Sequence, residues 1–161
     1  MYTAEFQIEL LGLDPEKIME PILDLTCGDG KLVLYLRELN LEAYGMDRDC
    51  DKQSPFLNRD YYLKVKINPS SYGTILSSGK FANDFIRHFF SNSGLYRAYG
   101  EKYLEILAAL KPGGAFHYAP TLPMIENLLS KDDFLVEKSH LIDDYYRTAV
   151  TKLGTDETEE S

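Results

Sequence analysis

Residues 21–31, with the sequence PILDLTCGDGK, constrain the fold of this chain more than any other stretch. An apolar run reaches an acidic residue, Asp24, and then enters a turn that contains Gly28 and Gly30. A helical pattern over residues 32–39 follows at once. Glycine has no Cβ, so the backbone of this turn can take positive φ and leave room for a ligand. The stretch therefore predicts a strand, a tight turn and a helix whose first N–H groups are free to bind.

The turn alone allows more than one interpretation. An ordinary strand-to-helix connection needs glycine only to reverse the chain. A dinucleotide-binding turn has the pattern G-x-G-x-x-G, or a final alanine, so that helix and strand pack closely. Read from Gly28, this chain has Val33 at that last position, which disfavours a nicotinamide dinucleotide.

Residues 22–30 resemble the first motif of the class I S-adenosylmethionine-dependent methyltransferases, which runs hydrophobic, hydrophobic, acidic, hydrophobic and then G-x-G-x-G. Thr26 departs from the motif, because the first glycine usually stands there. The resemblance implies a Rossmann-like fold and S-adenosylmethionine as the cofactor. The cofactor contacts that it implies in this stretch are Asp24, Thr26, Cys27, Gly28 and Gly30.

A second acidic residue supports this resemblance. Residues 42–46 predict a short second strand, and Asp47 follows it directly, seventeen positions after Gly30. A carboxylate at the end of a strand can accept two hydrogen bonds from a ribose diol. In the resembled family this position binds the ribose of the cofactor, whereas a solvated loop acid is the alternative. Asp60, with Asn58 as the other candidate, is expected to contact the adenine. Ser77, at the end of the fourth strand, is also expected to contact the cofactor.

The string LKPGG at residues 110–114 is the third point of resemblance. Pro112 is expected to end a helix, and the two glycines that follow it reverse the chain into a fifth strand, residues 115–119. The same string precedes the fifth strand in many class I methyltransferases.

The remaining pattern predicts an α/β three-layer sandwich with a mostly parallel sheet of about seven strands and an antiparallel C-terminal hairpin. Little chain separates Asp47 from Tyr61, so the helix usual between the second and third strands is expected to be short or missing. Leu104 is expected on the core-facing stripe of the helix before Pro112. Further expected strands are residues 61–67, 72–78, 134–141 and 145–153, and expected helices are residues 81–90 and 95–110.

Composition narrows the function. The 161 residues suit one domain, residues 1–154, followed by an acidic tail, residues 155–161, that is expected to be disordered. The net charge of −9 and the lack of a Lys/Arg cluster disfavour a nucleic-acid partner. No apolar run is long enough for a membrane helix, and the start does not resemble a signal peptide, so a cytoplasmic protein is expected. Cys27 and Cys50 are expected to be free thiols, and no metal site is predicted.

Methyl transfer from a sulfonium needs mainly orientation of the acceptor, so a catalytic triad is not required. The candidates for the acceptor side are Lys80, His117 and Tyr118. The sequence therefore predicts a methyltransferase acting on a small molecule or a protein. The alternative is a catalytically reduced S-adenosylmethionine-binding or regulatory module that needs a partner.

Overall fold

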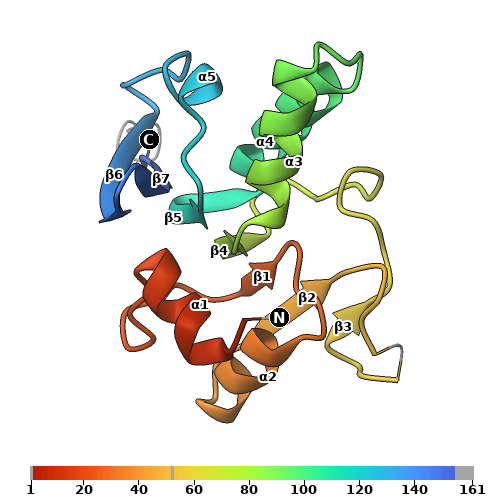
Figure 1. The fold of residues 1–161 in the computed structure, drawn as a ribbon. Coiled ribbons are helices and arrows are strands. Elements are labelled where there is room, and N and C mark those ends of the chain that lie inside the picture. Colours follow the sequence, from red (N-terminus) through yellow and green to blue (C-terminus); the bar gives the residue numbers. More distant parts are fainter. Residues whose placement is uncertain (1, 52, 155–161) are drawn as a thin grey trace.

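A single mixed sheet organises the molecule, for which the computed structural model describes residues 2–51 and 53–154. The strand order is β3-β2-β1-β4-β5-β7-β6 (Figure 1). The strands are β1 Ile22–Asp24, β2 Ala43–Met46, β3 Leu57–Asn58, β4 Tyr72–Ser77, β5 Leu110–Tyr118, β6 Phe134–Ile142 and β7 Tyr145–Lys152. The strands β1 to β5 pair in parallel, while β7 pairs antiparallel with both β5 and β6. The predicted sheet with its C-terminal hairpin is confirmed.

Helices cover both faces of this sheet and make three layers. Figure 1 shows α1 and α2 below the sheet and α3 and α4 above it. The helices are α1 Ala4–Leu11, α2 Lys31–Glu38, α3 Lys80–Phe90, α4 Tyr96–Ala108 and α5 Pro123–Glu126. Each of the two helical layers packs against the sheet around its own apolar cluster. One contains Leu32 and Leu36 of α2, and the other contains Phe81 of α3 and Tyr103 of α4. Because helices cover both faces of the sheet, β1 and β4 are almost wholly buried.

The predicted strand over residues 61–67 is wrong. The third strand is β3, which pairs with Gly45 and Met46 of β2. Residues 61–65 instead form a turn, in which the N–H groups of Lys64 and Val65 donate to the carbonyl of Tyr61. No helix lies between β2 and β3 among the residues described there, as expected from the short spacing.

Side chains of α4 supply the hydrogen bonds that a sheet would otherwise give to this segment. Lys102 Nζ donates to the carbonyl of Val65 at 2.7 Å, and the N–H of Ile67 donates to Glu105 Oε2 at 2.6 Å. The alternation of apolar and polar residues is therefore real, but its apolar members pack on the helices above the sheet.

Two further expectations, the start of β5 and the orientation of Leu104, also differ from the structure. Strand β5 begins at Leu110 and not after the glycine pair, because Leu110 already lies opposite Tyr72 of β4. The next pair is Ala115 opposite Thr74, so β5 advances by five residues while β4 advances by two, and the LKPGG string forms a bulge. Leu104 does not face the core and is 53% exposed. The expected tail, residues 155–161, lies outside the described residues.

Candidate functional site

The glycine turn is held between two neighbouring strands. The N–H of Leu25 donates to the carbonyl of Leu76 of β4, and the N–H of Cys27 donates to the carbonyl of Met46 of β2. Gly28 then takes a φ of +60°, in the left-handed region that favours glycine. The turn therefore lies at the carboxyl ends of three parallel strands, where open α/β sheets bind ligands.

Gly30 is required for the packing of the turn against Leu57 of β3. It is the residue before α2 and has a φ of +87°. A Cβ at this position would lie 2.5 Å from Leu57 Cδ1. The lack of a side chain is thus required by β3 as well as by the backbone conformation.

We expect Gly30→Ala to lower the free energy of unfolding by about 1–3 kcal/mol, because the new methyl group must displace Leu57 while the backbone stays strained. Urea unfolding measures this change. Gly94→Ala is the matched control, since a Cβ there meets nothing within 4 Å. Equal stability of the two variants would contradict the role of Leu57.

Asp47 joins the turn to the end of β2. Its Oδ2 accepts the N–H of Gly28 at 3.0 Å, and its Oδ1 accepts the N–H of Asp49 at 3.0 Å. Each oxygen therefore has one backbone partner, and each retains capacity for another donor. These two bonds fix the orientation of the carboxylate beside the turn.

Asp24 is buried directly beneath this turn. Its Oδ1 accepts the N–H of Thr26 at 3.4 Å, while its Oδ2 has no hydrogen-bond partner in the described part of the chain. Burial raises the pKa of its carboxyl from 3.8 to about 7. The N–H of Thr26 acts in the opposite direction, and the negative charge of Asp47 adds to the rise. An orphaned buried carboxylate oxygen is costly unless a donor or a cation approaches it.

The departure at Thr26 has a structural explanation. Thr26 Oγ1 lies 2.7 Å from Ser77 Oγ, and Ser77 Oγ also accepts the N–H of Phe81. Thr26 thus ties the glycine turn to the end of β4 and the start of α3. Ser77 and Asp24 are both fully buried, so they support the turn from below and do not line the cavities described next.

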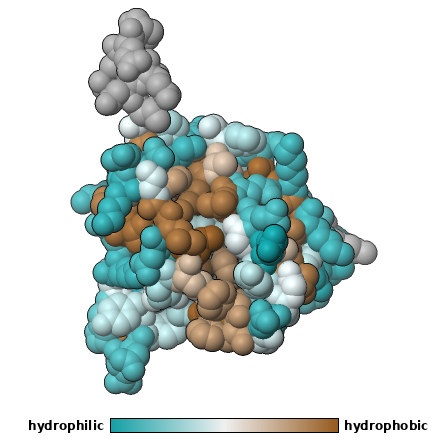
Figure 2. All heavy atoms as spheres, turned by 90° about the horizontal axis from the view of Figure 1, so that it is seen from above, coloured by the Kyte–Doolittle hydropathy of each residue, from teal (hydrophilic) through white to brown (hydrophobic). Residues whose placement is uncertain are grey.

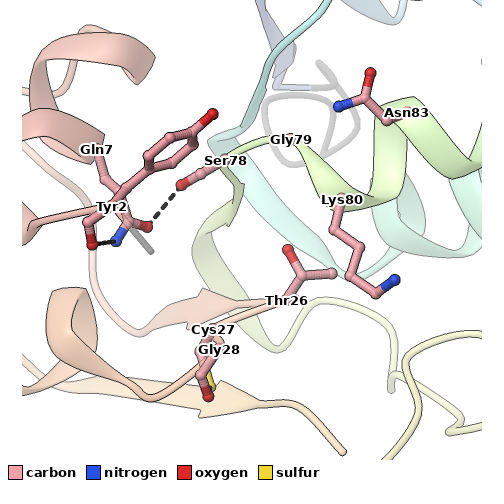
Figure 3. Close-up of a pocket in the computed structure, with 9 residues that line it drawn as sticks. All are labelled: Tyr2, Gln7, Thr26, Cys27, Gly28, Ser78, Gly79, Lys80 and Asn83. Atoms are coloured by element: carbon pink, nitrogen blue, oxygen red, sulfur yellow. Dashed lines mark hydrogen bonds between the residues drawn. The ribbon is translucent and has the colours of Figure 1, made fainter. Parts of the chain in front are cut away.

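Two cavities open beside the turn, and Thr26 and Lys80 line both. The first has a volume of about 350 Å³ and is drawn in Figure 3. Its other lining residues are Tyr2, Gln7, Cys27, Gly28, Ser78, Gly79 and Asn83. The second has a volume of about 310 Å³, and its lining includes Asp47, Asp60, Tyr61, Asp84 and His88.

Helix α1 closes one side of the first cavity. Figure 3 shows the amide of Gln7 between Tyr2 and Ser78. Gln7 Nε2 donates to the carbonyl of Tyr2 at 3.2 Å, and Ser78 Oγ donates to Gln7 Oε1 at 2.7 Å. The N-terminal helix is thus attached to the end of β4, which places its side chains over the glycine turn.

The second cavity is lined mainly by polar side chains. Asp84 accepts hydrogen bonds from Tyr62 at 2.9 Å and Lys80 at 3.2 Å, and it pairs with Arg87 at 3.4 Å. The guanidinium of Arg48 lies 3.6 Å from the centre of the Tyr61 ring, a cation–π contact at the same cavity. Asp84 therefore fixes Lys80 where the two cavities meet.

The structure brings most predicted residues together but places two of them elsewhere. Tyr118 is buried in the core and hydrogen-bonded to Tyr103 and Glu126. His117 lines a separate cavity with Gly12 and Thr74. Burial, and then the nearby Arg147, lower the pKa of His117 from 6.5 to about 4, so it is neutral at pH 7. Side chains alternate along a strand, and neither side of β5 here leads to the two cavities beside the turn.

Sequence reasoning missed several lining residues. Tyr2 and Gln7 precede the first strand, and no spacing relates them to the glycine turn. Asn83 could have been found, because it lies three positions after Lys80 in an expected helix and so shares its face.

The residues described form no cluster of His, Cys, Asp and Glu that could hold a metal ion. Cys27 and Cys50 are both buried free thiols, as expected. Across residues 2–51 and 53–154, no helix has the length and hydropathy to cross a membrane.

The strand order, the three layers and the glycine turn after β1 define the fold of class I S-adenosylmethionine-dependent methyltransferases, and solved structures confirm this likeness. A putative S-adenosylmethionine-dependent methyltransferase from Listeria monocytogenes is similar with a TM-score of 0.65 at 14% identity, over 94% of this chain and 100% of that chain. The Burkholderia thailandensis 1,6-didemethyltoxoflavin-N1-methyltransferase, solved with S-adenosylhomocysteine, is similar with a TM-score of 0.60 at 14% identity. This match covers 94% of this chain and 76% of that chain.

A third similar structure is a putative methyltransferase in complex with the Haloferax volcanii Trm112 methyltransferase activator, with a TM-score of 0.60 at 14% identity, over 94% of this chain and 89% of that one. No protein-family model and no curated protein sequence matches this chain. At such identities the likeness establishes the fold.

Proposed function

We propose that this protein is an S-adenosylmethionine-dependent methyltransferase that acts on a small-molecule or protein acceptor. The observation that carries the proposal is the carboxylate of Asp47, oriented by the N–H of Gly28 and lining a cavity beside the glycine turn. The fold supports it, because the similar structures include methyltransferases solved with S-adenosylhomocysteine.

The residues present fit such a cofactor. Each oxygen of Asp47 can accept one further hydrogen bond, which suits the two hydroxyls of a ribose. Asp60 lines the same cavity and is proposed at the adenine. Thr26, Cys27 and Gly28 line the adjoining cavity and would contact the amino-acid end of the cofactor. A cationic ligand bound above the turn would favour the ionised form of Asp24, whose Oδ2 has no partner among the described residues.

When bound, S-adenosylmethionine supplies a methyl group that is already activated. The chain then has to hold an acceptor in line with that group at about 3 Å and exclude water. Lys80 and Asn83 are proposed to contact the acceptor, because both line the first cavity next to Thr26.

A binding module that needs a partner is the second candidate. The observation that favours it is the short connection between β2 and β3, in which the described residues form no helix over that part of the sheet. One similar structure is a complex with a methyltransferase activator.

Calorimetric titration with S-adenosylhomocysteine tests the cofactor assignment. We expect Asp47→Ala to weaken binding about 5- to 150-fold, equivalent to about 1–3 kcal/mol for a lost charge-assisted pair. Asp49→Ala is the matched control, because Asp49 lines the same cavity but gives Asp47 only its backbone N–H. Urea unfolding of both variants shows whether the turn remains intact.

The absence of binding by the unmodified protein at millimolar ligand would overturn the proposed function. Binding together with mass-spectrometric detection of a methylated product in cell extract would support an enzyme. Binding without any product would favour the module.

A further inference from the structure

A groove on the opposite side of α3 from these cavities is lined by apolar side chains. It runs between α3, α4 and α5 and has a volume of about 350 Å³. We call it the α4 groove. Its apolar lining includes Phe89, Tyr96, Leu104, Met124, Ile125 and Leu128.

Several apolar side chains that line the α4 groove are exposed to solvent. Leu128 is 80% exposed, Leu104 is 53% exposed and Phe89 is 39% exposed. Figure 2, which looks down on the end of the molecule that carries α5, shows hydrophobic residues gathered in the middle of this face and hydrophilic residues around them. Contiguous apolar patches with a polar rim mark interaction sites. None of the residues named here lines the cavities beside the glycine turn, so the groove is a separate feature.

Two charged residues indicate what covers this groove. Arg97 and Glu101 both line it, are exposed, and lie one helical turn apart on α4. Among the described residues neither forms an ion pair, although their spacing would allow one. Arginine before glutamate is the less favourable order for a pair within one helix.

We propose that the α4 groove is covered by a second copy of this chain, related by a two-fold axis that sets the two α4 helices antiparallel. A two-fold interface is self-complementary, so a contact from residue i to residue j is repeated from j to i. With the axis passing midway between Arg97 and Glu101, Arg97 of each copy faces Glu101 of the other. Two opposite-charge pairs then form across the interface.

The same register pairs apolar side chains. Leu104 lies five positions beyond the midpoint and Tyr96 three positions before it, and both line the groove, so each Leu104 approaches the Tyr96 of the other copy. Tyr96 is 37% exposed in the single chain. The contact therefore buries one leucine and one tyrosine on each copy, both of which are partly exposed in the single chain.

The net charge of −9 opposes association but does not prevent it. At physiological ionic strength charges more than about 8 Å apart are largely screened, while the two facing pairs act at contact distance. The two facing charge pairs therefore favour this arrangement of the two copies at physiological ionic strength.

Sedimentation velocity of the full chain from about 1 µM to about 100 µM tests the proposal. We expect a shift with concentration from the 18.4 kDa monomer toward twice that mass. Arg97→Glu and Glu101→Arg should each raise the dimer dissociation constant at least about tenfold, because like charges then face one another in both pairs. Glu38→Arg, an exposed charge change on α2, should leave it unchanged.

Mixing the two single variants gives the decisive result. One chain then carries glutamate at both positions and the other carries arginine at both, so a mixed dimer restores two attractive pairs. The double variant R97E/E101R should also dimerise. A wild type that stays monomeric, or charge variants that dimerise as well as the wild type, would overturn the proposal. Failure of the mixture to associate would overturn the antiparallel arrangement.

Discussion

Asp24→Asn is expected to remove a pH dependence from the stability of this protein. Because burial raises the pKa of Asp24 from 3.8 to about 7, the folded state favours the protonated carboxyl. This stabilisation is complete below pH 3.8 and is lost as the pH rises through about 7. The asparagine variant resembles the protonated form at every pH. Relative to it, the wild type should therefore lose up to roughly 4 kcal/mol between pH 4 and pH 8.

Urea unfolding of both proteins across this range measures the difference. The comparison must be between variants, because other groups titrate in the same window. The effect of His117 on the free energy of unfolding has the opposite pH dependence to that of Asp24. Its pKa is lowered from 6.5 to about 4, so its stabilisation is present above pH 6.5 and is lost as the pH falls through about 4. His117→Gln is thus a control with the reverse slope. A constant difference between wild type and Asp24→Asn would show that Asp24 is not held in a buried, unpaired state.

Glu126→Ala is expected to lower the free energy of unfolding by about 3–5 kcal/mol. Glu126 is 4% exposed and holds together α5, β5 and the hairpin. It accepts hydrogen bonds from Tyr118, from Thr121 at 2.9 Å and from the N–H of Leu122 at 2.8 Å, and it pairs with Lys138 at 3.1 Å. Removing one member of a buried charged network leaves its partners unpaired in a medium that solvates them poorly.

The charge state of Glu126 supports this expectation. Burial alone raises the pKa of its carboxyl, but the donors around it act more strongly, and the net pKa is lowered below its usual value. The group is therefore ionised at pH 7. Glu137→Ala is the matched control, since Glu137 is exposed on β6. Urea unfolding measures the free energy of unfolding of the two variants. A decrease of less than about 1 kcal/mol for Glu126→Ala would contradict a buried network.

The gathering of the residues proposed to hold the cofactor could be predicted from local sequence. The acidic residue at the end of β1, the glycine turn and Asp47 at the end of β2 are each set by a few consecutive residues. Parallel strands bring their carboxyl ends to one edge of the sheet, so local signals were enough to bring these residues together. The role of Thr26 was not predictable, because it depends on Ser77, fifty-one positions later in the chain.

The sequence by itself determined the three-layer fold, the C-terminal hairpin and the glycine turn, because strand and helix periodicity and turn chemistry are local properties. Only the tertiary structure decided that residues 61–65 form a turn, since Lys102 satisfies a backbone carbonyl there. It also placed Gln7 over the turn, buried Tyr118 away from it and left Leu104 exposed. These outcomes depend on which elements pack together, and such contacts between distant residues leave no periodic signal in the chain.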